Sequence, residues 1–104
     1  MTSTDVETIF GRAAKRLRGV ERGKMLSANG LRDPDAGKFF AFTTRGMLVV
    51  KLPAERVTEL IESGEGRVFD AGKGRPMREW VGVMPADETA YAEYIREARK
   101  FVAG

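Results

Sequence analysis

The chain has 104 residues, with 18 lysine and arginine residues against 15 aspartate and glutamate residues, which gives a formal net charge of +3. This length and a 42% share of hydrophobic residues are typical of one globular domain, which we expect to cover residues 1–104. Because histidine and cysteine are absent, the sequence excludes a serine–histidine triad, a thiolate nucleophile and the common zinc sites, so we expect no enzyme, cofactor or metal site. The N-terminus lacks a basic start with a continuous apolar region, and no apolar run is long enough for a membrane span, so we expect a cytoplasmic protein without a membrane contact.

The first predicted element is an amphipathic helix that begins near Thr4. Thr4 and Glu7 have the spacing of a capping box, in which a hydroxyl and a carboxylate bind free backbone amides of the first turn. The apolar residues that follow recur at spacings of three and four and predict one buried stripe: Val6, Ile9, Phe10, Ala13, Leu17 and Val20.

The densest basic stretch of the chain covers residues 12–24, which contain a single acid, Glu21. One interpretation is a solvated helix face that continues into a loop. The alternative is a contact with an anion or with nucleic acid. The candidate residues for this contact are Arg12, Lys15, Arg16 and Arg18.

Residues 24–27 predict a short strand, and the following residues show turn chemistry at Asn29-Gly30 and again at 33–37. Two runs rich in aromatic and aliphatic residues then flank Thr44-Arg45-Gly46, which predicts an antiparallel hairpin. Strand alternation would place Phe40 and Phe42 on one face of the sheet, with Phe39 and Ala41 on the other. Since both faces are then apolar, we expect helices to cover one face and a partner to cover the other.

A second helix is predicted from Pro53, because proline at a first helical position leaves no further amide unpaired. Val57, Leu60 and Ile61 form its apolar stripe, and Gly64 ends it. Two more strands are predicted at residues 67–70 and 78–83. Asp87 is the predicted cap of a last helix. The apolar stripe of this helix consists of Tyr91, Tyr94, Ile95, Ala98 and Val102.

These elements predict an α+β fold of two layers, with three helices and a mostly antiparallel five-stranded sheet in the order α-β-β-β-α-β-β-α. Between the last two strands lies a basic, glycine-rich loop at residues 71–77. A Walker-type phosphate loop is excluded because Lys73 is followed by glycine and the loop leads into a strand. Three interpretations of the loop remain open. It is only a connecting turn, it contacts an anion or nucleic acid through Lys73 and Arg75, or it is a catalytic segment. Trp80 is either a core or dimer-interface anchor or a stacking platform.

The segment GKFFAFTTRGMLVVKLPAERVTELIESGEG, followed by GRPMREWVGV and a closing helix with EARKFV, resembles the TfoX N-terminal-domain-like family, a fold relative of the MmcQ/YjbR-like proteins. The shared features are an apolar–Lys–Leu strand end, a helix that ends in glycine, a Gly-Arg-Pro-Met turn and an aromatic residue in the next strand. The resemblance implies the α+β fold and a link to the regulation of transcription or competence, and it implies no reaction.

The sequence therefore favours a non-enzymatic binding or regulatory module that acts through protein contacts, as a homodimer or with another protein. The alternative is a weak, nonspecific nucleic-acid-binding protein that uses residues 12–24. A small enzyme is the second alternative. It would need an apolar-walled pocket in which ionisable groups converge, and we expect no such pocket. A pocket that joined Lys51, Glu79 or Tyr91 would favour the enzyme.

Overall fold

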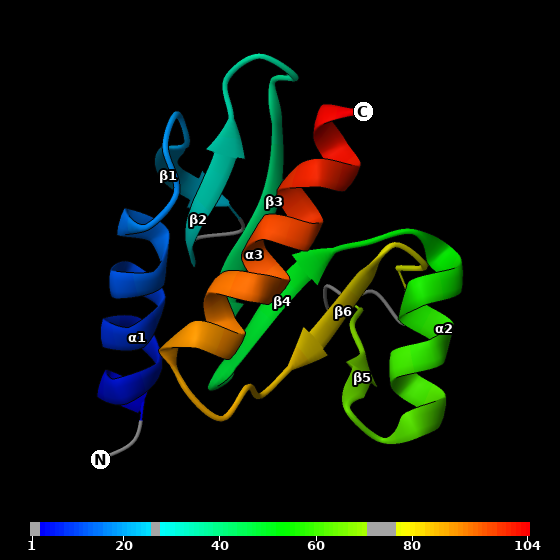
Figure 1. Ribbon diagram of the computed structural model, residues 1–104. Coiled ribbons are helices and arrows are strands. Elements are labelled where there is room, and N and C mark those ends of the chain that lie inside the picture. Colours follow the sequence, from blue (N-terminus) through cyan, green and yellow to red (C-terminus); the bar gives the residue numbers. More distant parts are fainter. Residues whose placement is uncertain (1–2, 26–27, 71–76) are drawn as a thin grey trace.

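The computed structural model describes residues 3–25, 28–70 and 77–104, to which all structural statements here refer (Figure 1). In chain order the elements are α1 (Ser3–Lys15), β1 (Glu21–Met25), β2 (Ala28–Asp33), β3 (Lys38–Thr44), β4 (Met47–Lys51), α2 (Ala54–Ser63), β5 (Gly66–Val68), β6 (Trp80–Val83) and α3 (Glu88–Ala103). They form an antiparallel sheet in the order β1-β2-β3-β4-β6-β5, and α3 crosses one face of it between α1 and α2 (Figure 1). The predicted α+β fold with three helices is confirmed. None of the helices in the described ranges has the length and apolar character to cross a bilayer.

The sheet has six strands rather than the predicted five, and the additional strand is β2. Asn29-Gly30 predicted a turn, but both residues pair with β1, and Gly30 also lies opposite Phe42 of β3. Pairing on both edges of β2 overrides the local turn preference of Asn-Gly. The first strand is also displaced, since it begins at Glu21, three residues before its predicted start.

The predicted hairpin is confirmed as β3 and β4, joined by Arg45-Gly46. Both loop residues have positive φ, 54° for Arg45 and 74° for Gly46. Two positive φ angles characterise the type I′ turn, whose twist matches that of the flanking strands.

The predicted alternation of Phe40 and Phe42 is wrong, because β3 contains a bulge. Leu31 pairs with Ala41, but the next residue, Arg32, pairs with Phe39, so Phe40 is the extra residue. As a result Phe40 and Ala41 both join the core beneath the helices, while Phe42 lies on the opposite face of the sheet.

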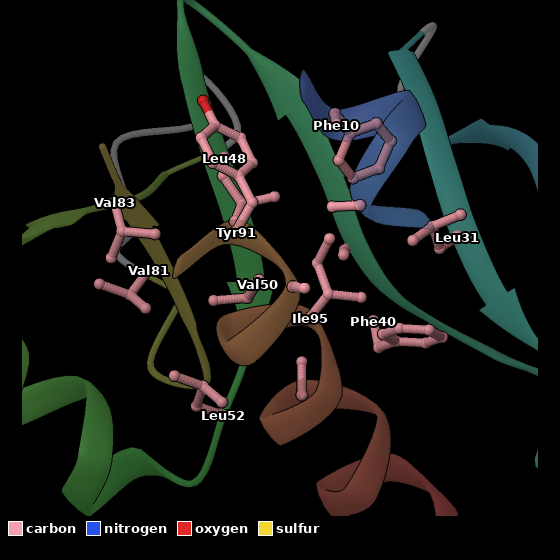
Figure 2. Packing of buried hydrophobic residues seen from close by; sticks show 14 of the residues in the cluster. Phe10, Leu31, Phe40, Leu48, Val50, Leu52, Val81, Val83, Tyr91 and Ile95 are labelled. Carbon is pink, nitrogen blue, oxygen red and sulfur yellow. The ribbon is translucent and has the colours of Figure 1, made fainter. Parts of the chain in front are cut away.

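The main core lies between the sheet and the three helices. Figure 2 shows Tyr91 and Ile95 of α3 among side chains of the sheet, with Phe10 of α1 beside them. The predicted helix stripes are buried at Phe10, Ala13, Val57, Leu60, Tyr91, Ile95 and Ala98. Each large apolar side chain buried here contributes about 1.5–3 kcal/mol relative to an exposed one.

A second, smaller cluster lies on the opposite face of the sheet and consists of Phe42, Val49, Phe69 and Trp80, with Met77 packed against it. The ring centroid of Phe42 lies 5.5 Å from that of Phe69 and 5.4 Å from that of Trp80. These side chains are already buried in the single chain, so the expectation that a partner must cover this face is not supported here. Trp80 is a core residue and not an exposed stacking platform.

The predicted helix ends are largely confirmed. Gly64 ends α2 in the left-handed conformation with φ 86°, and the Asp87 carboxylate accepts a hydrogen bond from the Ala90 amide at 2.9 Å. Pro53 is the N-cap of α2 rather than its first residue. The helix α1 begins one residue before Thr4, and the Glu7 carboxylate accepts a hydrogen bond from the Thr43 hydroxyl of β3 at 2.6 Å.

Candidate anion-binding groove

A basic groove is lined by the segment that follows α1 and by the last two turns of α3. Its volume is about 430 Å³. The residues that line it are Leu17, Arg18, Arg96, Arg99, Lys100 and Ala103. Four of these six side chains are cationic and none is a carboxylate, so the groove has a positive potential that favours an anion.

Helical spacing brings the three α3 cations of the groove together. Arg96, Arg99 and Lys100 are related as i, i+3 and i+4, which places them on one face of the helix. Cations near the C-terminal end of a helix also interact favourably with the helix dipole. The sequence Arg-Glu-Ala-Arg-Lys thus builds one wall of the groove.

Arg99 is held in a fixed position by the opposite wall. Its guanidinium donates hydrogen bonds to the carbonyl oxygens of Arg18 and Gly19, the latter at 3.3 Å. The same guanidinium lies 3.9 Å from the carboxylate of Asp33, which is only 2% exposed. Arg99 therefore connects the segment after α1 to α3, and the Asp33 carboxylate offsets part of the positive charge of Arg99.

The other three cations of the groove are available to a ligand. Arg18, Arg96 and Lys100 are exposed, and none makes an ion pair or hydrogen bond through its side chain with another described residue. An anion could bind them without first displacing a carboxylate. These three side chains are therefore the candidates for contacts with an anion in the groove.

The basic stretch predicted from the sequence is divided in the structure. Arg18 lines the groove, whereas Arg16 forms an ion pair with Glu88 at 2.9 Å. Arg12 and Lys15 are exposed on α1 outside the lining of the groove.

The remaining predicted contacts, Lys73 and Arg75, lie outside the described residues. Sequence reasoning missed the three cations of α3. Their i, i+3, i+4 spacing was visible in the sequence, but their position opposite Arg18 depends on the packing of two helices far apart in the chain.

A second hollow, of about 410 Å³, lies between the C-terminal end of α2 and the start of α3. Glu65, Arg67 and Tyr94 line it together with backbone and apolar groups, a convergence that the sequence did not predict. Burial raises the pKa of Tyr94, and the nearby Glu65 carboxylate adds to the shift. A phenol with a raised pKa is a weaker general acid near neutral pH.

Of the three residues whose convergence in a pocket would favour an enzyme, Lys51 and Glu79 form an ion pair outside the three hollows, and Tyr91 lies apart from them. The Lys51 ammonium lies 3.9 Å from the Glu79 carboxylate and 5.7 Å from the Trp80 ring centroid, beside the smaller cluster. Tyr91 instead belongs to the core beneath the helices. Within the described ranges, no three acidic side chains are grouped closely enough to hold a metal ion.

A third hollow, of about 370 Å³, lies between α2 and the strands β5 and β6. It is largely apolar, and Val57, Ile61, Met77 and Trp80 contribute to its lining. Val68 also lines it and is 55% exposed.

Comparisons of the chain with protein families, with curated proteins and with solved structures found no match. We therefore infer function from the chemistry of these surfaces.

Proposed function

We propose that this protein is a non-enzymatic binding module that takes nucleic acid into the basic groove by its phosphate backbone. The observation that carries the proposal is the lining of the groove, in which Arg18, Arg96 and Lys100 are free of carboxylate partners among the described residues. Phosphate contacts of this kind supply most of the affinity of nonspecific nucleic-acid binding.

The shape of the groove supports a polymer rather than a small anion. The groove is open to solvent along its length, and it offers no enclosed cavity in which a single phosphate would be surrounded by donors. Arg12 and Lys15 are also exposed on α1, outside the lining of the groove. A chain of phosphates can contact such separated cations at the same time.

The test is fluorescence anisotropy with a labelled oligonucleotide, comparing the protein with the variant Arg96→Glu/Lys100→Glu. This variant loses two phosphate contacts and introduces two carboxylates that repel phosphate. Binding should therefore weaken by about tenfold or more at low salt. The matched control is Arg67→Glu/Arg78→Glu, which changes the net charge equally at exposed positions within β5 and just before β6. Equal losses in both variants would show a general charge effect and would contradict the groove as the site.

A second candidate function is the regulatory module that acts through protein contacts, as the resemblance to the TfoX N-terminal-domain-like family implies. The observation that favours it is the apolar hollow beside Val68, since exposed apolar surface marks many protein interfaces. Homodimerisation is one form of this proposal. A stable dimer should bury more than about 1,000 Å² and persist in sedimentation at micromolar concentration. A strict monomer at high concentration would contradict the homodimer.

A further inference from the structure

The basic groove contains no aromatic ring, which bears on the kind of nucleic acid it can bind. All nine aromatic residues of the chain are in described positions, and none lines the groove. Six of them are buried in the two clusters: Phe10, Phe40, Phe42, Phe69, Trp80 and Tyr91. The groove therefore offers cations and two aliphatic side chains, but no platform for an unstacked base.

Proteins that bind single strands combine cations with aromatic side chains on which bases stack, and each stacked base contributes about 1–3 kcal/mol. Without stacking, affinity depends on phosphate charge. A duplex presents one charge per roughly 1.7 Å of its axis, about twice the density of one strand. A cluster of cations in a single short groove thus gains more from a duplex.

The following inference rests on the proposed function. We propose that the groove binds the phosphate backbone of duplex nucleic acid in preference to single strands and without regard to base sequence. Arg18, Arg96 and Lys100 make the phosphate contacts. Arg99 is a positioning residue, because its hydrogen bonds to the Arg18 and Gly19 carbonyls set the distance between the two walls. No asparagine, glutamine or carboxylate lines the groove to read a base edge, so we expect phosphates to determine binding.

The number of contacts predicts the salt dependence. Three neutralised phosphates give a slope of about −2.7 in a plot of log affinity against log salt for a duplex. A threefold rise in salt should therefore weaken duplex binding by about twentyfold. A slope shallower than about −1 would overturn the three-cation assignment.

The experiment uses the full chain and three labelled probes of equal length: a duplex, one of its single strands, and a duplex of unrelated sequence. We expect the two duplexes to bind equally and the single strand to bind several-fold more weakly. A single strand that binds as tightly as the duplex, or a more than tenfold difference between the duplexes, would overturn the inference. Tighter binding to vesicles with anionic lipid than to either duplex would overturn it as well.

Variants distinguish failure of this inference from failure of the proposed function. If single strands bind best and Arg96→Glu/Lys100→Glu removes that binding, the groove binds nucleic acid but the duplex preference is wrong. If no probe binds at low salt, both proposals fail. Because charge reversal could disturb α3, Arg96→Ala/Lys100→Ala is measured in parallel, and both variants are checked by circular dichroism for unchanged helix content.

Discussion

At the scale of single residues, Gly66 of β5 lies where a side chain has no room, which predicts that a substitution there destabilises the fold. A Cβ atom at Gly66 would lie 2.7 Å from Val81 and 2.9 Å from Leu60, both buried in the main core. Neither neighbour can move without repacking the core, so Gly66→Ala should lower the free energy of unfolding by about 1–3 kcal/mol. Urea denaturation measures the difference.

Gly82→Ala is the matched control. A Cβ atom there would also lie 2.7 Å from its nearest neighbour, but that neighbour is the sulfur of Met47, a flexible side chain near the surface. We expect a clearly smaller loss than for Gly66→Ala, because the methionine can rotate away. Equal losses of stability in both variants would show that the distance from the added Cβ to its nearest neighbour determines the loss, and that the rigidity of this neighbour does not.

Tyr91 predicts how stability changes at alkaline pH. Burial raises the pKa of Tyr91 above its usual 10.0, and the Glu7 carboxylate adds to the shift. The folded protein therefore keeps the phenolic proton at pH values where the unfolded chain has lost it. The contribution is fully present below pH 10.0 and is lost as pH rises from there through the raised folded pKa.

We expect the free energy of unfolding of Tyr91→Phe to fall less steeply above pH 10.0 than that of the parent protein. Every other ionisable group is shared by the two proteins, so the difference between the two curves isolates the phenol. Parallel curves would show that Tyr91 does not carry this dependence.

At the scale of elements, α3 depends on its first turn. The Asp87 carboxylate accepts the Ala90 amide hydrogen bond, which satisfies one of the free donors at the helix start. Asp87→Ala should lower the free energy of unfolding by about 1 kcal/mol, whereas Asp87→Ser, which retains a capping oxygen, should lose much less. Thermal unfolding compares the three proteins. A serine variant as unstable as the alanine variant would exclude capping as the cause.

Elements with strong local signals could be predicted from the sequence. The Arg45-Gly46 turn, the end of α2 at Gly64 and the cap at Asp87 each depend on residues adjacent in the chain. The strand β2 could not be predicted, because Asn29-Gly30 is locally a turn sequence and becomes a strand only through pairing with two neighbours. The bulge at Phe40 escaped prediction for the same reason, since it exists only relative to β2.

At the scale of the whole molecule, the strands β4 and β6 contribute to both clusters. In β4, Val49 faces the smaller cluster and Val50 the main core; in β6, Trp80 and Val81 divide in the same way. Loss of either cluster would therefore remove support from the strands of the other. This arrangement predicts one cooperative unfolding transition.

Trp80 is the only tryptophan of the chain and reports on the smaller cluster. Its fluorescence should change at the same urea concentration as the far-ultraviolet circular dichroism of the helices. Phe69→Leu serves as a control that loosens the smaller cluster alone, and both signals should shift together. Trp80 fluorescence that changes at lower urea would show that the smaller cluster unfolds separately.

The basic groove belongs to this largest scale, which explains why the sequence predicted only part of it. Arg18 belongs to the basic stretch read from the sequence and lines the groove, but Arg16 from the same stretch is paired with Glu88. Whether a cation faces a ligand or a carboxylate depends on the packing of α1 against α3, which no local pattern encodes.

The attachment of Arg99 to Gly19 has a consequence for the order in which the protein can assemble. The two residues are 80 positions apart, so during synthesis α1 leaves the ribosome long before the helix against which it packs. Until α3 has been synthesised, only the early strands can cover the apolar stripe of α1. Contacts of such long separation form slowly, because the intervening chain must first be brought together. We therefore expect the groove to be among the last features of the molecule to form, because only a chain that has completed both layers can present it.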